Sequence, residues 1–157
     1  MNPRFRIVGS ALAAVMLLSV AAAPAALGKG RPLKAVLTGA AEVPSPGDPD
    51  GTGLAKLRLN QGKRRVCYKI QVNDIDVATA VHIHAGAADV SGGVVLTLGT
   101  PDVTGFVKGC VNDVERSLIK DMRKHRSDYY VNVHNAEFAD GALRGQLSKK
   151  APGRHRK

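Results

Sequence analysis

The chain has 157 residues, two cysteines and a formal net charge of +10. A charge of this size raises the question of a nucleic-acid or membrane partner. The surplus lies at the ends of the chain, because residues 32–148 hold 14 lysines and arginines against 13 aspartates and glutamates, a net of +1. The one basic run of the body, Lys63 to Arg65, lies at a predicted turn without interleaved aromatics, so we expect no nucleic-acid partner.

The first residues predict a segment that is removed from the mature protein. Two arginines precede an apolar run from Ala11 to Ala23, and small residues follow the run. This arrangement is typical of a secretory signal peptide, and the run is short for a transmembrane span. We expect a signal peptide over residues 1–25, cleaved near Ala25, and a linker over residues 26–32. An uncleaved N-terminal anchor is the alternative. Export would make the protein secreted or cell-envelope associated, with no transmembrane segment after cleavage.

Residues 33–148 predict a single all-β domain. Short runs of alternating apolar and polar residues, separated by glycine-, proline- and aspartate-rich turns, are typical of the strands of a sandwich or barrel. The expected strands lie at Ala35–Thr38, Ala55–Leu59, Arg65–Val72, Ala78–His84, Val94–Leu98, Thr104–Val111, Tyr129–His134 and Ala142–Leu147. Residues 42–53 contain turn-forming residues throughout, which predicts an ordered loop.

One segment departs from the strand period. Asn112 and Glu115 have the spacing of a capping box, and apolar residues recur at helical intervals from Val114 to Met122. Basic residues crowd the last turn, where they interact favourably with the helix dipole, and His125 is expected to cap it. The pattern predicts one short amphipathic helix that crosses over the sandwich.

The basic C-terminal residues 149–157 predict a disordered tail. Basic tails can hold a protein near anionic cell-envelope polymers, and they can equally serve solubility alone. We expect a monomeric chain whose partner is an unknown extracellular ligand or a cell-envelope polymer.

Cys67 and Cys110 predict one disulfide, because exported proteins enter an oxidising compartment. Each cysteine shares the solvent-facing side of its strand with a lysine, Lys69 or Lys108, which suits a bridge between two strands. The spacing fits no zinc motif of paired cysteines.

Three histidines are the candidate metal ligands. His82 and His84 lie two residues apart on one predicted strand, so both imidazoles project from the same face. His134 projects from a second strand, away from the valines that flank it. If the two strands are neighbours, three imidazoles with an open fourth position fit copper or catalytic-type zinc. The alternative is structural, with the histidines hydrogen-bonded to the backbone of glycine-rich loops.

Glu42, Asn132 and Arg144 are further polar candidates. Arg144 is expected either to pair with Glu42 across the end of the sandwich or to present its guanidinium to an anionic ligand. Glu42 is then that partner or a fourth metal ligand, and Asn132 shares the face of His134. The sequence contains no nucleophile elbow, phosphate loop, dinucleotide fingerprint or close carboxylate pair, so we expect no catalytic residues and no enzyme.

With these residues identified, the chain resembles the CHRD (chordin) domain. The shared segments keep their order and spacing from Leu33 to Leu147; they are Leu37–Gly39, Glu42–Pro44, Ala80–Gly86, Tyr130–Asn135 and Gly141–Leu147. Ala142 and Leu143 depart from the family pattern, which has an acidic residue there. The resemblance implies an extracellular domain, found alone in bacterial secreted proteins, with no established enzymatic activity.

The resemblance and the strand pattern together predict a Greek-key β-sandwich, immunoglobulin-like or superoxide-dismutase-like, with one short crossover helix. A weaker similarity is to copper–zinc superoxide dismutase, also a sandwich with a His-x-His strand. This chain lacks that family's further metal-binding histidines. The leading hypothesis is a secreted binding or structural module that holds a metal ion at the three histidines. The alternatives are a copper-dependent redox enzyme and an envelope protein anchored by its basic tails.

Overall fold

The computed structural model describes residues 30–149. The predicted signal peptide and nearly all of the predicted tail lie outside the described residues. The elements follow in chain order as β1 (Arg31–Thr38), β2 (Thr52–Asn60), β3 (Arg65–Asn73), β4 (Ala78–Ala85), β5 (Val94–Leu98), β6 (Phe106–Val111), α1 (Arg116–Lys124), β7 (Tyr129–Asn135) and β8 (Leu143–Gln146), with single 3-10 turns at Gly39–Ala41 and Arg126–Asp128.

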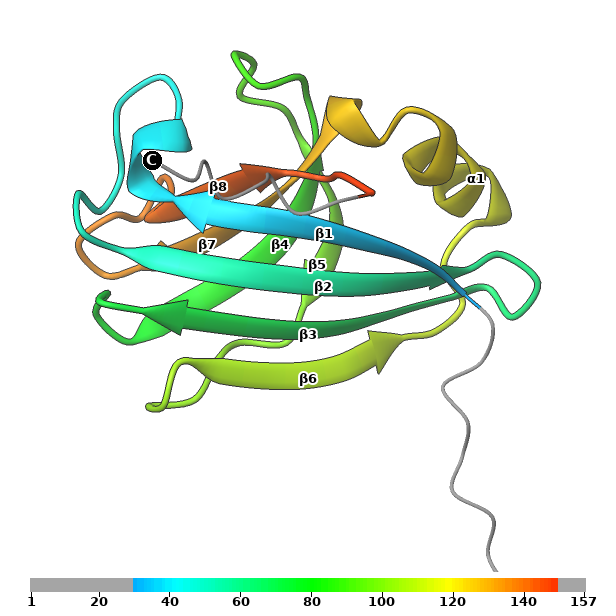
Figure 1. Ribbon diagram of the computed structural model, residues 1–157, viewed down its shortest axis with the longest axis horizontal. Coiled ribbons are helices and arrows are strands. Elements are labelled where there is room, and N and C mark those ends of the chain that lie inside the picture. Colours follow the sequence, from blue (N-terminus) through cyan, green and yellow to red (C-terminus); the bar gives the residue numbers. More distant parts are fainter. Residues whose placement is uncertain (1–29, 150–157) are drawn as a thin grey trace, which may run out of the picture.

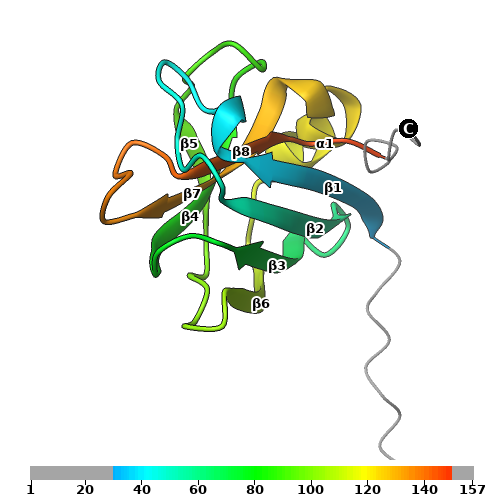
Figure 2. The same ribbon diagram turned by 60° about the vertical axis from the view of Figure 1, so that its left-hand side comes forward.

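The eight strands form one antiparallel sheet in the order β5-β4-β7-β8-β1-β2-β3-β6. The sheet folds on itself, with β1, β2, β3 and β6 in one layer and β4, β5 and β7 in the layer behind (Figures 1 and 2). Its two edge strands, β5 and β6, contact each other without pairing. The chain returns from β6 through α1 to place β7 beside β4, which is a Greek-key connection. The prediction of an all-β sandwich with one short helix is confirmed.

Alternation along the strands builds the core between the layers. Leu33, Ala35 and Leu37 of β1 are buried, and so are Val131 and Val133 of β7. Inward residues of the other strands join them, together with Ile119 and Met122 of α1, which are fully buried. The apolar stripe of α1 is therefore part of the core, as its helical spacing predicts.

Several expected strand bounds differ from the observed ones by one to four residues, and the start of β1 and the start of the helix differ for clear physical reasons. Strand β1 begins at Arg31, so its first two residues fall in the predicted linker, where Arg31 pairs with Leu59 of β2. The helix begins at Arg116, and the capping box of Asn112 and Glu115 does not form, since no side chain caps it. Asp113 has a positive φ of 57°, and the Val114 amide bonds to the Arg64 carbonyl. These two features hold the segment against the β2–β3 turn in place of a helical first turn.

The predicted disulfide between Cys67 and Cys110 is confirmed. The two cysteines lie directly opposite each other on β3 and β6. Because β6 pairs with β3 alone, the bridge fastens an edge strand to the sheet. None of the helices between residues 30 and 149 has both the length and the apolar character needed to cross a membrane.

Strand β7 is buried on both faces, and this positions the candidate site. Its inward face packs in the core, while Tyr130 and Asn132 on its outer face are 1% and 3% exposed. Two loops cover that outer face. The loop of residues 86–93 accepts hydrogen bonds there from β4 and β8 side chains, and the loop of residues 39–51 carries the buried Glu42.

Candidate metal centre

The structure brings the three predicted histidines together on neighbouring strands. His82 and His84 project from β4, and His134 projects from β7, which pairs with β4 in antiparallel register. One ligand nitrogen from each lies within 4.8 Å of the others. The histidines form the one cluster of three or more metal-ligating side chains among residues 30–149. Glu42 is not a member of this cluster, so the expectation of Glu42 as a fourth ligand is wrong.

Backbone carbonyls fix the orientation of two of the rings. The Nδ1–H of His84 donates to the Gly92 carbonyl at 2.9 Å, and the Nδ1–H of His134 donates to the Ala139 carbonyl at 2.9 Å. A neutral imidazole that donates from Nδ1 carries its lone pair on Nε2. Both Nε2 atoms are therefore set up as ligand atoms. That of His84 is buried and without a hydrogen-bond partner.

The third ring completes the cluster through its own Nδ1. His82 Nδ1 lies 3.2 Å from His134 Nε2, at hydrogen-bond distance. Since His134 offers a lone pair there, His82 is the donor of this contact. A metal ion would replace the shared proton, with Nδ1 of His82 and Nε2 of His84 and His134 as the ligand atoms. Hydrogen bonds from the other ring nitrogens are the usual support for such ligands.

Burial favours the neutral forms of His82 and His84, and the neutral imidazole is the form that binds metals. Desolvation is the main cause that lowers the pKa of His82, and the neighbouring His134 and His84 lower it further. Desolvation is also the main cause that lowers the pKa of His84, although its bond to Gly92 opposes the shift. His134 and the positive charge of Arg144 add to the lowering.

Tyr130 is a supporting residue that the sequence did not identify. Its ring stacks on His84, with centroids 4.8 Å apart and planes at 12°. Its hydroxyl contacts the same Gly92 that holds His84, accepting from the amide at 3.1 Å. The Arg144 guanidinium lies 3.5 Å from the centroid of the ring. His84 is therefore held in two ways: Tyr130 stacks on its ring, and the Gly92 carbonyl accepts a hydrogen bond from its Nδ1. Tyr130 and Gly92 also contact each other.

Arg144 fastens that loop, and its predicted direct ion pair with Glu42 is wrong. It is 1% exposed, and its Nη2 donates to the carbonyls of Ala87 at 2.6 Å and Val90 at 2.9 Å. Gln146 adds a bond from its amide to the Gly86 carbonyl at 2.9 Å. Both ion pairs among residues 30–149 lie elsewhere. The Arg144 guanidinium thus holds the loop by hydrogen bonds to the backbone carbonyls of Ala87 and Val90.

Glu42 is buried beneath the glycine at position 141. A Cβ added to Gly141 would lie 2.6 Å from its carboxyl oxygen, so a glycine is needed for this packing. Burial raises the pKa of Glu42 to about 7, against the opposing effects of the Arg144 charge and the Val43 amide. Its Oε1 and the Nη1 of Arg144 are both buried without a hydrogen-bond partner, as is Oδ1 of Asn132.

Replacing Glu42 with glutamine should remove a pH-dependent cost to stability. A carboxyl whose pKa rises from 4.5 to about 7 on folding destabilises the fold progressively as pH increases across that window. We expect Glu42→Gln to match the parent at pH 4.5 and to exceed it at pH 8, by at most about 3 kcal/mol. Urea unfolding at both pH values measures the difference. Destabilisation of Glu42→Gln that is larger at pH 8 than at pH 4.5 would contradict this expectation, because it would mean that the ionised carboxylate stabilises the fold.

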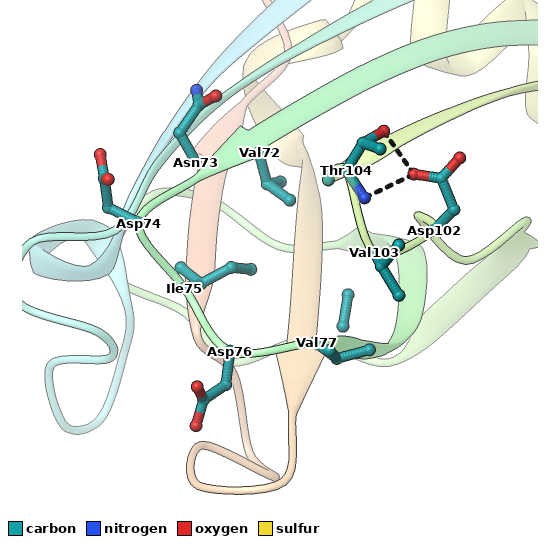
Figure 3. Close-up of a pocket in the computed structure, with 11 residues that line it drawn as sticks. Val72, Asn73, Asp74, Ile75, Asp76, Val77, Asp102, Val103 and Thr104 are labelled. Carbon is teal, nitrogen blue, oxygen red and sulfur yellow. Dashed lines mark hydrogen bonds between the residues drawn. The ribbon is translucent and has the colours of Figure 1, made fainter.

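A pocket away from the histidines is lined by acidic residues whose carboxylates do not point toward a common position (Figure 3). It has a volume of about 330 Å³ and lies between residues 72–78 and 102–105. Asp74 and Asp76 point away from it, and Asp102 accepts hydrogen bonds from Thr104 (Figure 3). These carboxylates do not assemble a cation site, so the histidine cluster remains the candidate centre.

Comparison with known proteins gives one match. The model of the CHRD domain family matches residues 33–147, nearly the whole described domain. Searches of curated proteins and of solved structures found no match. The match includes all three histidines, Arg144 and both cysteines, in a fold of the expected all-β type. The chain belongs to the CHRD domain family.

Proposed function

We propose that this domain is an extracytoplasmic module that binds one transition-metal ion through His82, His84 and His134. The observation that carries the proposal is the meeting of three imidazole nitrogens within 4.8 Å of one another. In His84 and His134, the hydrogen bond that Nδ1 donates to a backbone carbonyl fixes the orientation of the ring and so of the ligand nitrogen Nε2. The buried Nε2 of His84 has no protein partner, which fits a ligand atom and does not fit a purely structural histidine.

The structural and metal-binding roles of the histidines use different atoms. The loop contacts of His84 and His134 occupy Nδ1 alone. The sequence offered these roles as alternatives, whereas the geometry allows one ring to perform both. The hydrogen bonds that hold the loops therefore also orient the ligand nitrogens.

Imidazole ligands favour copper or zinc. Both cysteines are in the disulfide, so no thiolate competes as a ligand. Three nitrogen ligands leave a fourth position for water or another molecule. Divalent copper binds such sites more tightly than zinc, so we expect the higher affinity for copper.

The family and the disulfide support an extracellular location for this function. CHRD domains are typically extracellular, and a disulfide indicates an oxidising compartment. We propose that residues 1–25 direct secretion and are then removed. Detection of the processed chain in the culture medium or the envelope fraction, with a new N-terminus near Ala25, tests this part of the proposal.

Isothermal titration of the metal-free protein with Cu(II) or Zn(II) tests the metal site. We expect one ion per chain, and His82→Ala should weaken binding by at least about 100-fold, because a direct ligand contributes more than a supporting residue. His82 is the preferred position, since its ring contacts the other two histidines and holds no loop. His125→Ala is the matched control, because His125 lies at the end of α1 and bonds to Asp121. Equal affinity of parent and His82→Ala would reject the site.

The copper-loaded protein also distinguishes a metal-binding module from a redox enzyme. If copper binds at the three histidines, superoxide turnover by the copper-loaded protein, absent in His82→Ala, would support the redox enzyme. Bound copper without turnover supports a binding module, which is the function that we propose.

A further inference from the structure

The sheet layer that faces away from the histidines carries a row of lysines. Lys34, Lys56, Lys69 and Lys108 lie directly opposite one another across β1, β2, β3 and β6. Lys56, Lys69 and Lys108 are exposed, and Lys34 is half-buried. Arg58 lies on the same face, two residues along β2 from Lys56. Five cations are thus held on one side of four neighbouring strands.

No acidic residue offsets this charge within the sheet. All 13 aspartates and glutamates lie outside the eight strands, although they nearly balance the cations of residues 32–148. Within the described part of the chain, neither ion pair involves a residue of the row. Like charges directly opposite each other on adjacent strands destabilise a sheet. The row therefore carries a cost that no ion pair between residues 30 and 149 offsets.

The spacing of the charges is fixed by the sheet. Neighbouring strands lie about 4.8 Å apart, so the four lysine positions extend over about 14 Å. The outermost lysine is on an edge strand, and the disulfide holds that strand two residues away at Cys67 and Cys110. Lys69 is further ordered above the Phe106 ring, with Nζ 5.2 Å from its centroid.

A shallow groove accompanies the row. Its volume is about 270 Å³, and its lining includes Lys34, Lys56, Arg58 and Lys69 together with Pro32 and Cys67. The groove is thus lined by basic residues together with a proline and a disulfide-bonded cysteine, beside Leu33, Leu57 and Tyr68. Such a surface suits a ligand that has apolar ring faces and regularly spaced anions.

We propose that this groove binds a linear anionic polysaccharide that runs across the strands. A polyuronate carries one carboxylate per sugar ring, so its charges recur at a spacing close to that of the strands. Single-stranded nucleic acid needs exposed aromatic platforms, whereas Phe106 lies beneath Lys69. The oxidising compartment indicated by the disulfide also contains anionic glycans more commonly than nucleic acid.

The test uses the full chain and polygalacturonate as the probe, with affinity measured as a function of salt. We expect Lys56→Glu/Lys69→Glu to weaken binding by at least about 10-fold. The slope of log affinity against log salt should fall by about 2, one for each lost contact. The control is Lys63→Glu/Lys120→Glu, two exposed lysines away from the row with the same change in charge; it should keep the parent affinity. Chelators should have no effect, because the row is independent of the histidines.

Folding and binding are checked together in the single variant Lys56→Glu, because the double variant keeps like charges at the paired positions 56 and 69. Lys56 lies between Lys34 and Lys69, so Lys56→Glu converts two like-charge pairs into opposite-charge pairs and should raise Tm. A higher Tm with weaker binding separates loss of the surface from loss of the fold. Equal losses in the sheet variant and the control would overturn the proposal in favour of general basicity. Tighter binding to duplex DNA, or to vesicles containing phosphatidylglycerol, would overturn the choice of polysaccharide.

Discussion

Arg144→Ala should destabilise the folded domain by about 3–5 kcal/mol, because a buried cation–π stack and two hydrogen bonds are lost together. The guanidinium lies on the Tyr130 ring, and its Nη2 donates to the carbonyls of Ala87 and Val90. Its removal leaves those carbonyls without this donor. The loop would loosen at the segment that also contains Gly92, the residue that orients His84. We therefore also expect metal affinity to fall by about 10- to 100-fold, as for other supporting residues.

Two further variants at position 144 separate the contribution of the hydrogen bonds to stability from that of the planar stack. Arg144→Met keeps most of the volume but donates no hydrogen bond, and Arg144→Lys keeps the charge but loses the planar stack. Urea unfolding and amide exchange of residues 86–93 provide the readouts. If the methionine variant is as stable as the parent and exchanges at the same rate, the loop is not held by the guanidinium.

Removing the disulfide should cost about 4 kcal/mol in the chain-entropy model, because the bridge spans 43 residues of sequence. The Cys67→Ala/Cys110→Ala variant is expected to unfold at a lower temperature, with the largest loss of protection in β6. That strand pairs with β3 alone, so it depends on the bridge more than a central strand does. Thermal melts and hydrogen exchange, compared with the parent under oxidising conditions, measure both effects.

The histidine site provides the control for this variant. Its ligands lie on β4 and β7, and neither cysteine contributes to those strands. At temperatures where the variant remains folded, we expect the metal affinity of the parent. Uniform loss of protection across the sheet would contradict a local role for the bridge.

Side-chain alternation explains why much of the fold and of the site could be predicted. The period of two identifies the strands and places the imidazoles of His82 and His84 on one face. The expected strand Val94–Leu98 has the bounds that the structure gives it. The capping box failed because Asn112 and Glu115 have the right types and spacing, whereas Asp113 adopts a positive φ that directs the chain away from a helical turn. Spacing alone carries no information on that dihedral angle.

The supporting contacts of the site depend on long-range register. Gly92 and Ala139 act through their carbonyl groups, which every residue possesses, so the sequence does not mark them as supports of the histidines. Tyr130 shares a face with His134 in the sequence, but its stack on His84 follows from the pairing of β4 with β7. The lysine row is similar, because each lysine is visible as an outward position while their alignment requires the register of four strands.

The most direct test of the metal site is a crystal structure of the zinc-loaded protein, with anomalous diffraction recorded at the zinc edge. We expect one anomalous peak at about 2.0–2.1 Å from Nδ1 of His82 and from Nε2 of His84 and His134. The bonds from Nδ1 of His84 to Gly92 and of His134 to Ala139 should remain. A peak at any other position, or no peak between the three histidines in the presence of zinc, would contradict the proposed site.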